Sequence, residues 1–161
     1  MNPKFWQFLG FTANSYLMPI KPREGEKPRF WRGSPAHKGN YSHARDIITP
    51  DPNITKLPVY APASGRIHAL NQADLYGGII PNFIMIATEH GEYCELVHIA
   101  KSSCPFSVGD HVQIGQIIAE TGVNGFMLNN EHLHIMVCIR AKNKDGFVSL
   151  RIRWQKNPVY P

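Results

Sequence analysis

Histidine is the residue type that stands out in this chain, because eight of its 161 residues are histidines. Two of them form the pair His132-Leu133-His134 at the start of a predicted strand. Since side chains alternate between the two faces of a strand, both imidazoles point the same way, about 7 Å apart. Two imidazoles on one face can serve one metal site, one as a ligand and the other as its neighbour. By itself, a His-x-His pair is weak evidence for such a site.

A carboxylate with two histidines upstream is the second candidate. Asp46 follows His37 by nine residues and His43 by three. With a distant third imidazole, these residues could form a His₂Asp set, which leaves a position for water as in catalytic zinc sites. Taken alone, the pattern favours a turn capped by Asp46 beside two exposed loop histidines.

His98 is the third candidate. It lies between Val97 and Ile99, near the end of an otherwise apolar predicted strand. A lone histidine in such a place is more often a core residue with a satisfied hydrogen bond than a functional group. The sequence indicates no role for the remaining three histidines, which are His68, His90 and His111.

Short strands must position these side chains. Apolar and polar residues alternate along residues 66–70 and 132–140, and two apolar segments flank the turn His90-Gly91-Glu92, which predicts a β-hairpin. The hairpin strands are residues 82–88 and 93–99, and further strands are expected at 112–114, 116–120 and 148–152. A short helix is expected within residues 1–20 and an extended loop at 21–45. The pattern predicts an all-β, mainly antiparallel sandwich or barrel with a short N-terminal helix and long loops.

Composition narrows the class of protein. The chain is 43% hydrophobic and only 18% charged, which argues against disorder or a coiled coil. Its length predicts a single domain over residues 1–161. The net charge of +5 favours anionic partners, but no nucleic-acid-binding motif is present. The sequence shows no transmembrane run and no signal peptide, and its three cysteines form no Cys-x-x-Cys pair. We expect buried thiols, or a Cys94–Cys104 disulfide if the chain is exported.

Several short motifs follow one another in a specific order between about His37 and Val137. They are Ala44-Arg45-Asp46-Ile47, residues 58–67, Gly77-Gly78, Asn82, residues 90–93, Val97-His98-Ile99, residues 109–112, residues 115–118, Thr121-Gly122 and His132-Leu133-His134. This ordered set resembles the lysostaphin/LytM-type zinc metallopeptidases, which cleave peptide bonds in bacterial peptidoglycan. The resemblance implies a barrel-sandwich hybrid fold with a peptidase core at about 37–140. It leaves an N-terminal extension, 1–36, and a C-terminal strand and tail, 141–161.

The resemblance also implies roles for individual residues. Asp46 and His134 match zinc ligands, and His98 and His132 match the two catalytic imidazoles. In the commonest pattern the third ligand lies four residues before the aspartate, where this chain has Ser42. Variants with a longer loop place that histidine before a glycine, as in His37-Lys38-Gly39, so we favour His37 over His43. Glu131 stands where the family usually has proline.

The implied function is that of a peptidoglycan endopeptidase with one Zn²⁺ per chain. Zinc activates a water, His132 is the general base, and His98 donates a hydrogen bond to the developing oxyanion. The implied partners are peptidoglycan peptides, with an anionic cell-wall polymer as a further partner of the basic surface. We expect a monomer in the cell envelope or outside the cell, without nucleic acid. Whether a glycine bridge or a direct cross-link is cleaved stays open.

Two other functions fit parts of the pattern. The first is a non-catalytic module that binds the cell wall or activates an amidase, although such relatives usually lack part of the ligand set. The second is a lipoyl or biotinyl carrier, which residues 109–116 resemble. Such carriers need a lysine at a hairpin tip, and the matching turn His90-Gly91-Glu92 has none.

Overall fold

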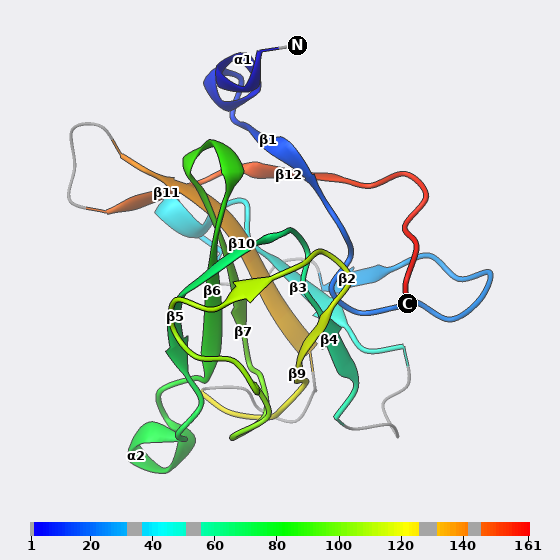
Figure 1. The fold of residues 1–161 in the computed structure, drawn as a ribbon, viewed down its shortest axis with the longest axis vertical. Coiled ribbons are helices and arrows are strands. Elements are labelled where there is room, and N and C mark those ends of the chain that lie inside the picture. The colour runs from blue at the N-terminus through cyan, green and yellow to red at the C-terminus, as the bar shows by residue number, and fades with distance from the viewer. Residues whose placement is uncertain (1, 32–36, 51–55, 126–131, 142–145) are drawn as a thin grey trace.

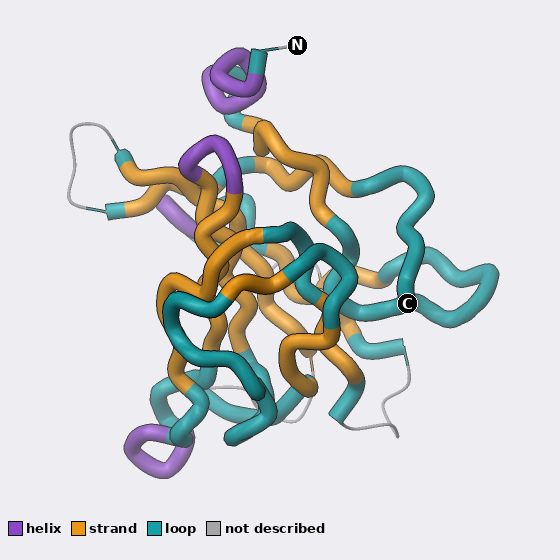
Figure 2. The backbone as a smooth tube through the Cα atoms, viewed as in Figure 1, coloured by secondary structure: helices purple, strands orange, loops and turns teal. Residues whose placement is uncertain are grey.

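Strands are the main regular secondary structure in the computed structural model, which describes residues 2–31, 37–50, 56–125, 132–141 and 146–161. The helices of this part of the chain are short and lie at the periphery (Figure 1 and Figure 2). These features confirm the predicted all-β, mainly antiparallel fold with a short N-terminal helix. None of the helices described is long and apolar enough to span a membrane.

The main sheet of the described residues has eight strands, in the order β2-β3-β10-β7-β6-β5-β8, with β11 paired to the last residues of β10. All neighbours in it are antiparallel. Its strands are β2 (Arg29–Trp31), β3 (Arg45–Ile48), β5 (Gly65–Asn71), β6 (Phe83–Thr88), β7 (Glu92–Val97), β8 (His111–Val112), β10 (His132–Arg140) and β11 (Phe147–Ser149).

Two smaller sheets and four helical turns complete the described fold. An antiparallel pair joins β4 (Pro58–Tyr60) to β9 (Ile117–Glu120), and a parallel pair joins β1 (Phe11–Tyr16) to β12 (Arg151–Trp154). The helices are α1 (Pro3–Phe8) and α2 (Leu75–Gly78), and the 3₁₀ turns are η1 (Gly39–Tyr41) and η2 (Glu89–Gly91).

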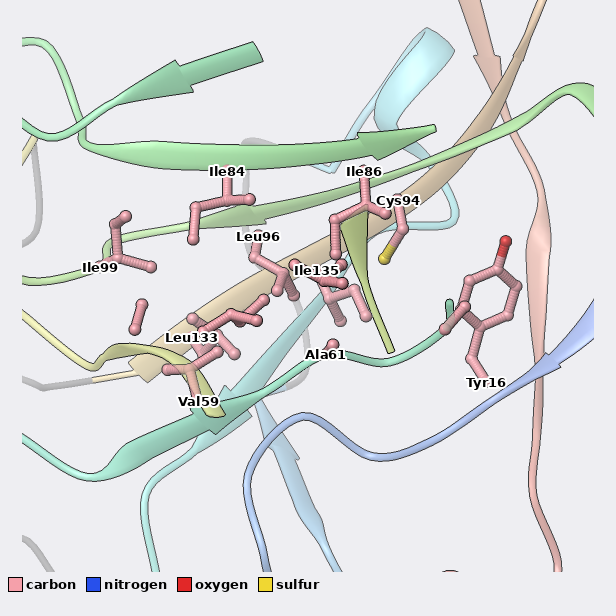
Figure 3. Packing of buried hydrophobic residues seen from close by; sticks show 14 of the residues in the cluster. Tyr16, Val59, Ala61, Ile84, Ile86, Cys94, Leu96, Ile99, Leu133 and Ile135 are labelled. Carbon is pink, nitrogen blue, oxygen red and sulfur yellow. The ribbon is translucent and has the colours of Figure 1, made fainter. Parts of the chain in front are cut away.

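The core lies between one face of the main sheet and the β4–β9 pair. Alternation along the hairpin strands turns Ile84, Ile86 and Leu96 into this core, as Figure 3 shows. The same alternation in β10 buries Leu133 and Ile135. All five side chains are completely shielded from solvent, and burying each contributes roughly 1.5–3 kcal/mol. The core therefore fixes which face of β10 is left for His132 and His134.

A buried carboxylate attaches the N-terminal segment to the β6–β7 hairpin. Glu92, the first residue of β7, is fully buried. Its carboxylate accepts hydrogen bonds from the Asn14 side chain at 2.9 Å, the Tyr16 hydroxyl at 2.9 Å and the Gln7 side chain at 3.2 Å. The backbone N–H groups of Ala13 and Asn14 donate to it as well. Because charged acceptors make the stronger hydrogen bonds, this cluster holds α1 and β1 against the turn of the hairpin.

Two predicted segments differ in kind from the structure, besides strand ends that differ by one or two residues. The expected loop at 21–45 contains β2 and η1, because three residues there pair with β3 rather than remaining extended and unpaired. The single strand expected at 148–152 is divided into β11 and β12. The division falls at Leu150, which is buried and donates its backbone N–H to the Val137 carbonyl. Before Leu150 the chain pairs with β10, and after it the chain pairs with β1.

All three cysteines are free and buried. Cys94 and Cys104 belong to the main core, and Cys138 packs with Ala44 and Met136 on the opposite face. The disulfide considered between Cys94 and Cys104 is therefore absent. Burial raises the pKa of each thiol, so the cysteines behave as small apolar residues.

We expect Glu92→Gln to lower the free energy of unfolding by about 2 kcal/mol. One carboxylate oxygen becomes an NH₂ group, so the N–H and O–H groups that donate to that oxygen lose their acceptor and face another donor. Equilibrium unfolding in urea measures the change. Glu89→Gln is the matched control, since the Glu89 side chain is 82% exposed and should change stability by less than about 0.5 kcal/mol. Equal stability of the two variants would show that the cluster around Glu92 does not hold the segment.

Candidate metal centre

Two neighbouring strands bring Asp46 and His134 face to face. In the antiparallel pair of β3 and β10, Asp46 is the direct partner of His134, and Ile48 is the partner of His132. Directly opposed residues have Cβ atoms about 4.5–5.5 Å apart on the same face of a sheet. Since Leu133 and its partner Ile47 fill the core, the polar pair must lie on the other face.

His37 completes a set of three ligand atoms. His134 Nδ1 lies 2.9 Å from Asp46 Oδ1, and His37 Nε2 lies 3.2 Å from the same oxygen. The two imidazole nitrogens are 3.3 Å apart. Ligands held about 2.0–2.1 Å from a tetrahedral ion would be separated by roughly 3.3 Å, so these three atoms fit one zinc ion without rearrangement.

The environment favours the protonation states that a metal requires. The side chains of His37, Asp46 and His134 are 12%, 8% and 14% exposed. Burial lowers the pKa of His37, which favours the neutral imidazole. Burial alone would raise the pKa of Asp46, but the hydrogen bond from His134 and the nearby imidazoles outweigh it and leave that pKa below its usual value. A neutral imidazole and an ionised carboxylate are the forms that bind metal.

His132 and His98 lie beside this set. His132 Nε2 is 3.8 Å from Asp46 Oδ1, and its side chain is 15% exposed. The ring centroids of His98 and His132 are 4.9 Å apart, and those of His98 and His134 are 6.4 Å apart. Four histidines from three separate segments of the chain thus meet around one carboxylate, on the face of the sheet opposite the core.

His98 has a defined neutral tautomer. Its Nδ1 lies 2.9 Å from the backbone carbonyl of Asn124, and a carbonyl oxygen can only accept, so Nδ1 carries the proton. Burial, with the charges of His132 and His134, lowers the pKa of His98 to about 4. In neutral His98 the other ring nitrogen, Nε2, is therefore an acceptor.

His43 does not join the cluster. Its backbone N–H donates to the Ser149 hydroxyl at 3.3 Å. Burial, followed by the charges of Arg151 and Arg45, lowers the pKa of its imidazole. The geometry thus favours His37 as the third ligand. His68 packs edge-on against Tyr93 with centroids 4.9 Å apart, away from the three ligand atoms.

Sequence reasoning missed two residues next to the cluster. Trp31, which is 46% exposed, lies edge-on to His132 with centroids 6.4 Å apart. The pairing of Trp31 with Asp46 between β2 and β3 places it there. β2 has only three residues, which is too short a strand to show a hydrophobic period. Asn124 supplies its backbone carbonyl, which no side-chain pattern could reveal. Glu131 lies outside the described residues.

Solved structures of peptidases share this fold. A zinc-containing peptidase from Vibrio cholerae is 19% identical with a TM-score of 0.57, and the match covers 93% of this chain and 42% of that one. The antimicrobial peptidase lysostaphin from Staphylococcus simulans is 26% identical with a TM-score of 0.52, covering 71% and 43%. The catalytic domain of a mutant of the prophage-encoded M23 protein EnpA from Enterococcus faecalis is 19% identical with a TM-score of 0.54, covering 80% and 93%.

The chain spans less than half the length of the Vibrio cholerae protein and of lysostaphin. No curated protein matches its sequence. The model of peptidase family M23 matches residues 45–146, which is more than half of the chain and includes Asp46, His98, His132 and His134. The chain therefore belongs to peptidase family M23.

Proposed function

We propose that this chain is a zinc-dependent endopeptidase that hydrolyses peptide bonds in bacterial peptidoglycan. The observation that carries the proposal is the convergence of His37, Asp46 and His134, with ligand atoms within 4.8 Å of one another, beside the imidazoles of His98 and His132. Membership of peptidase family M23 supports a peptidase. The resemblance to lysostaphin/LytM-type enzymes supports peptidoglycan as the substrate, and a net charge of +5 suits an anionic cell wall.

His37, Asp46 and His134 would hold the zinc ion. Two imidazoles and one carboxylate are three protein ligands, which leave a fourth position open, as catalytic zinc sites do. Bound there, zinc acts as a Lewis acid that polarises a carbonyl and makes water nucleophilic near neutral pH. The three ligand residues would fix the position of that chemistry on the face of the sheet opposite the core.

His132 is the proposed general base. It shares the face of β10 with His134, and its Nε2 is 3.8 Å from Asp46 Oδ1, so it adjoins the ligand set without belonging to it. An imidazole in this place takes a proton from the attacking water and can later deliver it to the leaving amine.

His98 is the proposed stabiliser of negative charge on the scissile carbonyl. Because Nδ1 is committed to the Asn124 carbonyl, only Nε2 can act on the substrate. That nitrogen is an acceptor in neutral His98. It becomes a donor to an oxyanion only after taking up a proton from solvent water, so the role requires the imidazolium form of His98.

We expect His132→Ala and His98→Ala each to reduce hydrolysis of purified cell walls at least 100-fold, because each removes a proton-transferring or charge-stabilising group. Both variants should keep about one zinc per chain. The assay digests walls of defined cross-link type and identifies the released fragments by mass. His111→Ala, at an exposed position on the edge strand β8, is the control and should retain full activity. Undiminished hydrolysis by both variants would overturn the catalytic assignment.

The third ligand is tested by comparing His37→Ala with His43→Ala. The first should lose tightly held zinc after dialysis against a weak chelator, because two ligands remain. The second should retain it, since His43 lies outside the cluster. Elemental analysis of the dialysed proteins gives the zinc content. Loss of zinc in His43→Ala, with retention in His37→Ala, would reverse the assignment.

A further inference from the structure

His98 adopts a backbone conformation that its side chain disfavours. It follows directly after β7, and its φ angle is +72°, in the left-handed region that residues with a Cβ seldom occupy. This angle ends the strand that the sequence predicts to run on to residue 99. Strained conformations of this kind persist only where the surroundings over-determine them, and they are concentrated at functional sites.

Three hydrogen bonds hold His98 in this conformation. Its backbone N–H donates to the carbonyl of Asn82 at 2.8 Å, and its own carbonyl accepts from Gly122 at 2.8 Å. Its ring donates from Nδ1 to the carbonyl of Asn124 at 2.9 Å. The backbone and the imidazole of His98 are thus fixed separately, and two of the three partners are asparagines.

These two asparagines are bound to each other. The backbone N–H of Asn82 donates to Asn124 Oδ1 at 2.8 Å. Both side-chain amides donate to the same carbonyl, that of Ile99, at 3.2 Å from Asn82 and 2.7 Å from Asn124. Asn82 exchanges two further bonds with Asp74, from Nδ2 to Oδ1 at 2.7 Å and from the Asp74 N–H to Oδ1 at 3.1 Å.

Burial gives this network its rigidity. Asn82 is completely buried and Asn124 is 8% exposed. Buried polar groups that are fully hydrogen-bonded have one arrangement, because any other leaves unpaired donors in a low-dielectric interior. Since the side chain of Asn124 is locked in this way, its backbone carbonyl has a fixed direction toward His98. A shift of that carbonyl would release Nδ1.

We propose that Asn82 and Asn124 are positioning residues that hold His98 as its Nδ1-protonated tautomer and direct Nε2 toward the substrate. The inference deepens the proposed function and rests on it for its effect on catalysis. The asparagines act through His98 and touch neither the ligand atoms nor the reacting bond. Their loss should therefore lower kcat while KM and zinc content stay nearly constant.

The first test compares Asn82→Ala and Asn124→Ala with Asn71→Ala. Asn71 is a matched control because it also supports the segment that leads to Asn82, donating to the Pro81 carbonyl at 3.1 Å, without bonding to Asn124 or His98. On a soluble peptidoglycan fragment, we expect kcat to fall 10- to 100-fold in the first two variants, with KM within threefold and about one zinc per chain. Asn71→Ala should keep both constants. The proposal is overturned if kcat falls equally in all three variants, or if it falls in none of them.

The second test does not depend on activity. Nitrogen-15 NMR of the zinc-loaded protein reports which nitrogen of each histidine carries a proton, and zinc is diamagnetic. His98 should appear as the Nδ1-protonated tautomer in the wild type and in Asn71→Ala, and as a mixture of tautomers in Asn82→Ala and Asn124→Ala. An Nε2-protonated His98 in the wild type, or an unchanged His98 in both variants, would contradict the proposal.

Asn124→Asp extends both tests if an alanine variant does not fold. It keeps the oxygen that accepts from Asn82 but replaces the donor to Ile99 with a second acceptor, so it should shift the tautomer and kcat in the same direction. The two proposals fail separately. A protein that hydrolyses no cell wall but shows the expected tautomer change refutes the function and leaves the positioning role of the asparagines intact.

Discussion

The register between β3 and β10 is the constraint on which the rest of the site depends. It sets Asp46 opposite His134 and places Ile47 opposite Leu133 in the core. Because side chains alternate with a period of two, a shift of β3 by one residue would carry Asp46 into the core and Ile47 out of it, away from His134 and Leu133. The hydrophobic burial that stabilises the fold therefore also fixes the positions of the two best-defined ligand atoms. Packing of the core is thus sufficient to position Asp46 and His134.

The remaining groups are held differently, because they come from turns and strand ends. His37 precedes η1 and reaches the pair from outside the sheet. His98 lies just beyond the last residue of β7 and keeps a left-handed backbone. Neither can rely on strand pairing for its orientation. For His98 a buried polar network takes the place of strand pairing. Such a network destabilises the fold if any of its hydrogen bonds is missing, and it holds one arrangement of side chains if all are made. This contrast explains why the environment of His98 is rich in buried amides while that of His134 is mainly a strand ladder.

The sequence predicts best those features that follow from local alternation. It predicts a strand over residues 132–140, the limits of β10, because apolar residues alternate there with the two histidines at its start. The choice of His37 over His43 comes from the resemblance, not from spacing, and the geometry favours it. In contrast, β2 is a strand only because β3 lies beside it, and its three residues within a Pro- and Gly-rich segment carry no period. The hold of Asn124 on His98 passes through a backbone carbonyl, which every residue possesses, so sequence alone could not indicate it.

The N-terminal segment, although outside the matched family region, bears on the site through the β6–β7 hairpin. At one end of β7, the buried Glu92 binds α1 and β1, and just past the other end stands His98. His98 is the sixth residue after Glu92, which corresponds to roughly 20 Å along an extended strand. A paired strand hardly changes length, so fixing one end limits where the other can lie. The β6–β7 ladder continues into the bond from His98 to Asn82, which joins the strand to the asparagine network. The hairpin is therefore held at both ends by buried polar groups, the Glu92 carboxylate at one end and the asparagine network around His98 at the other.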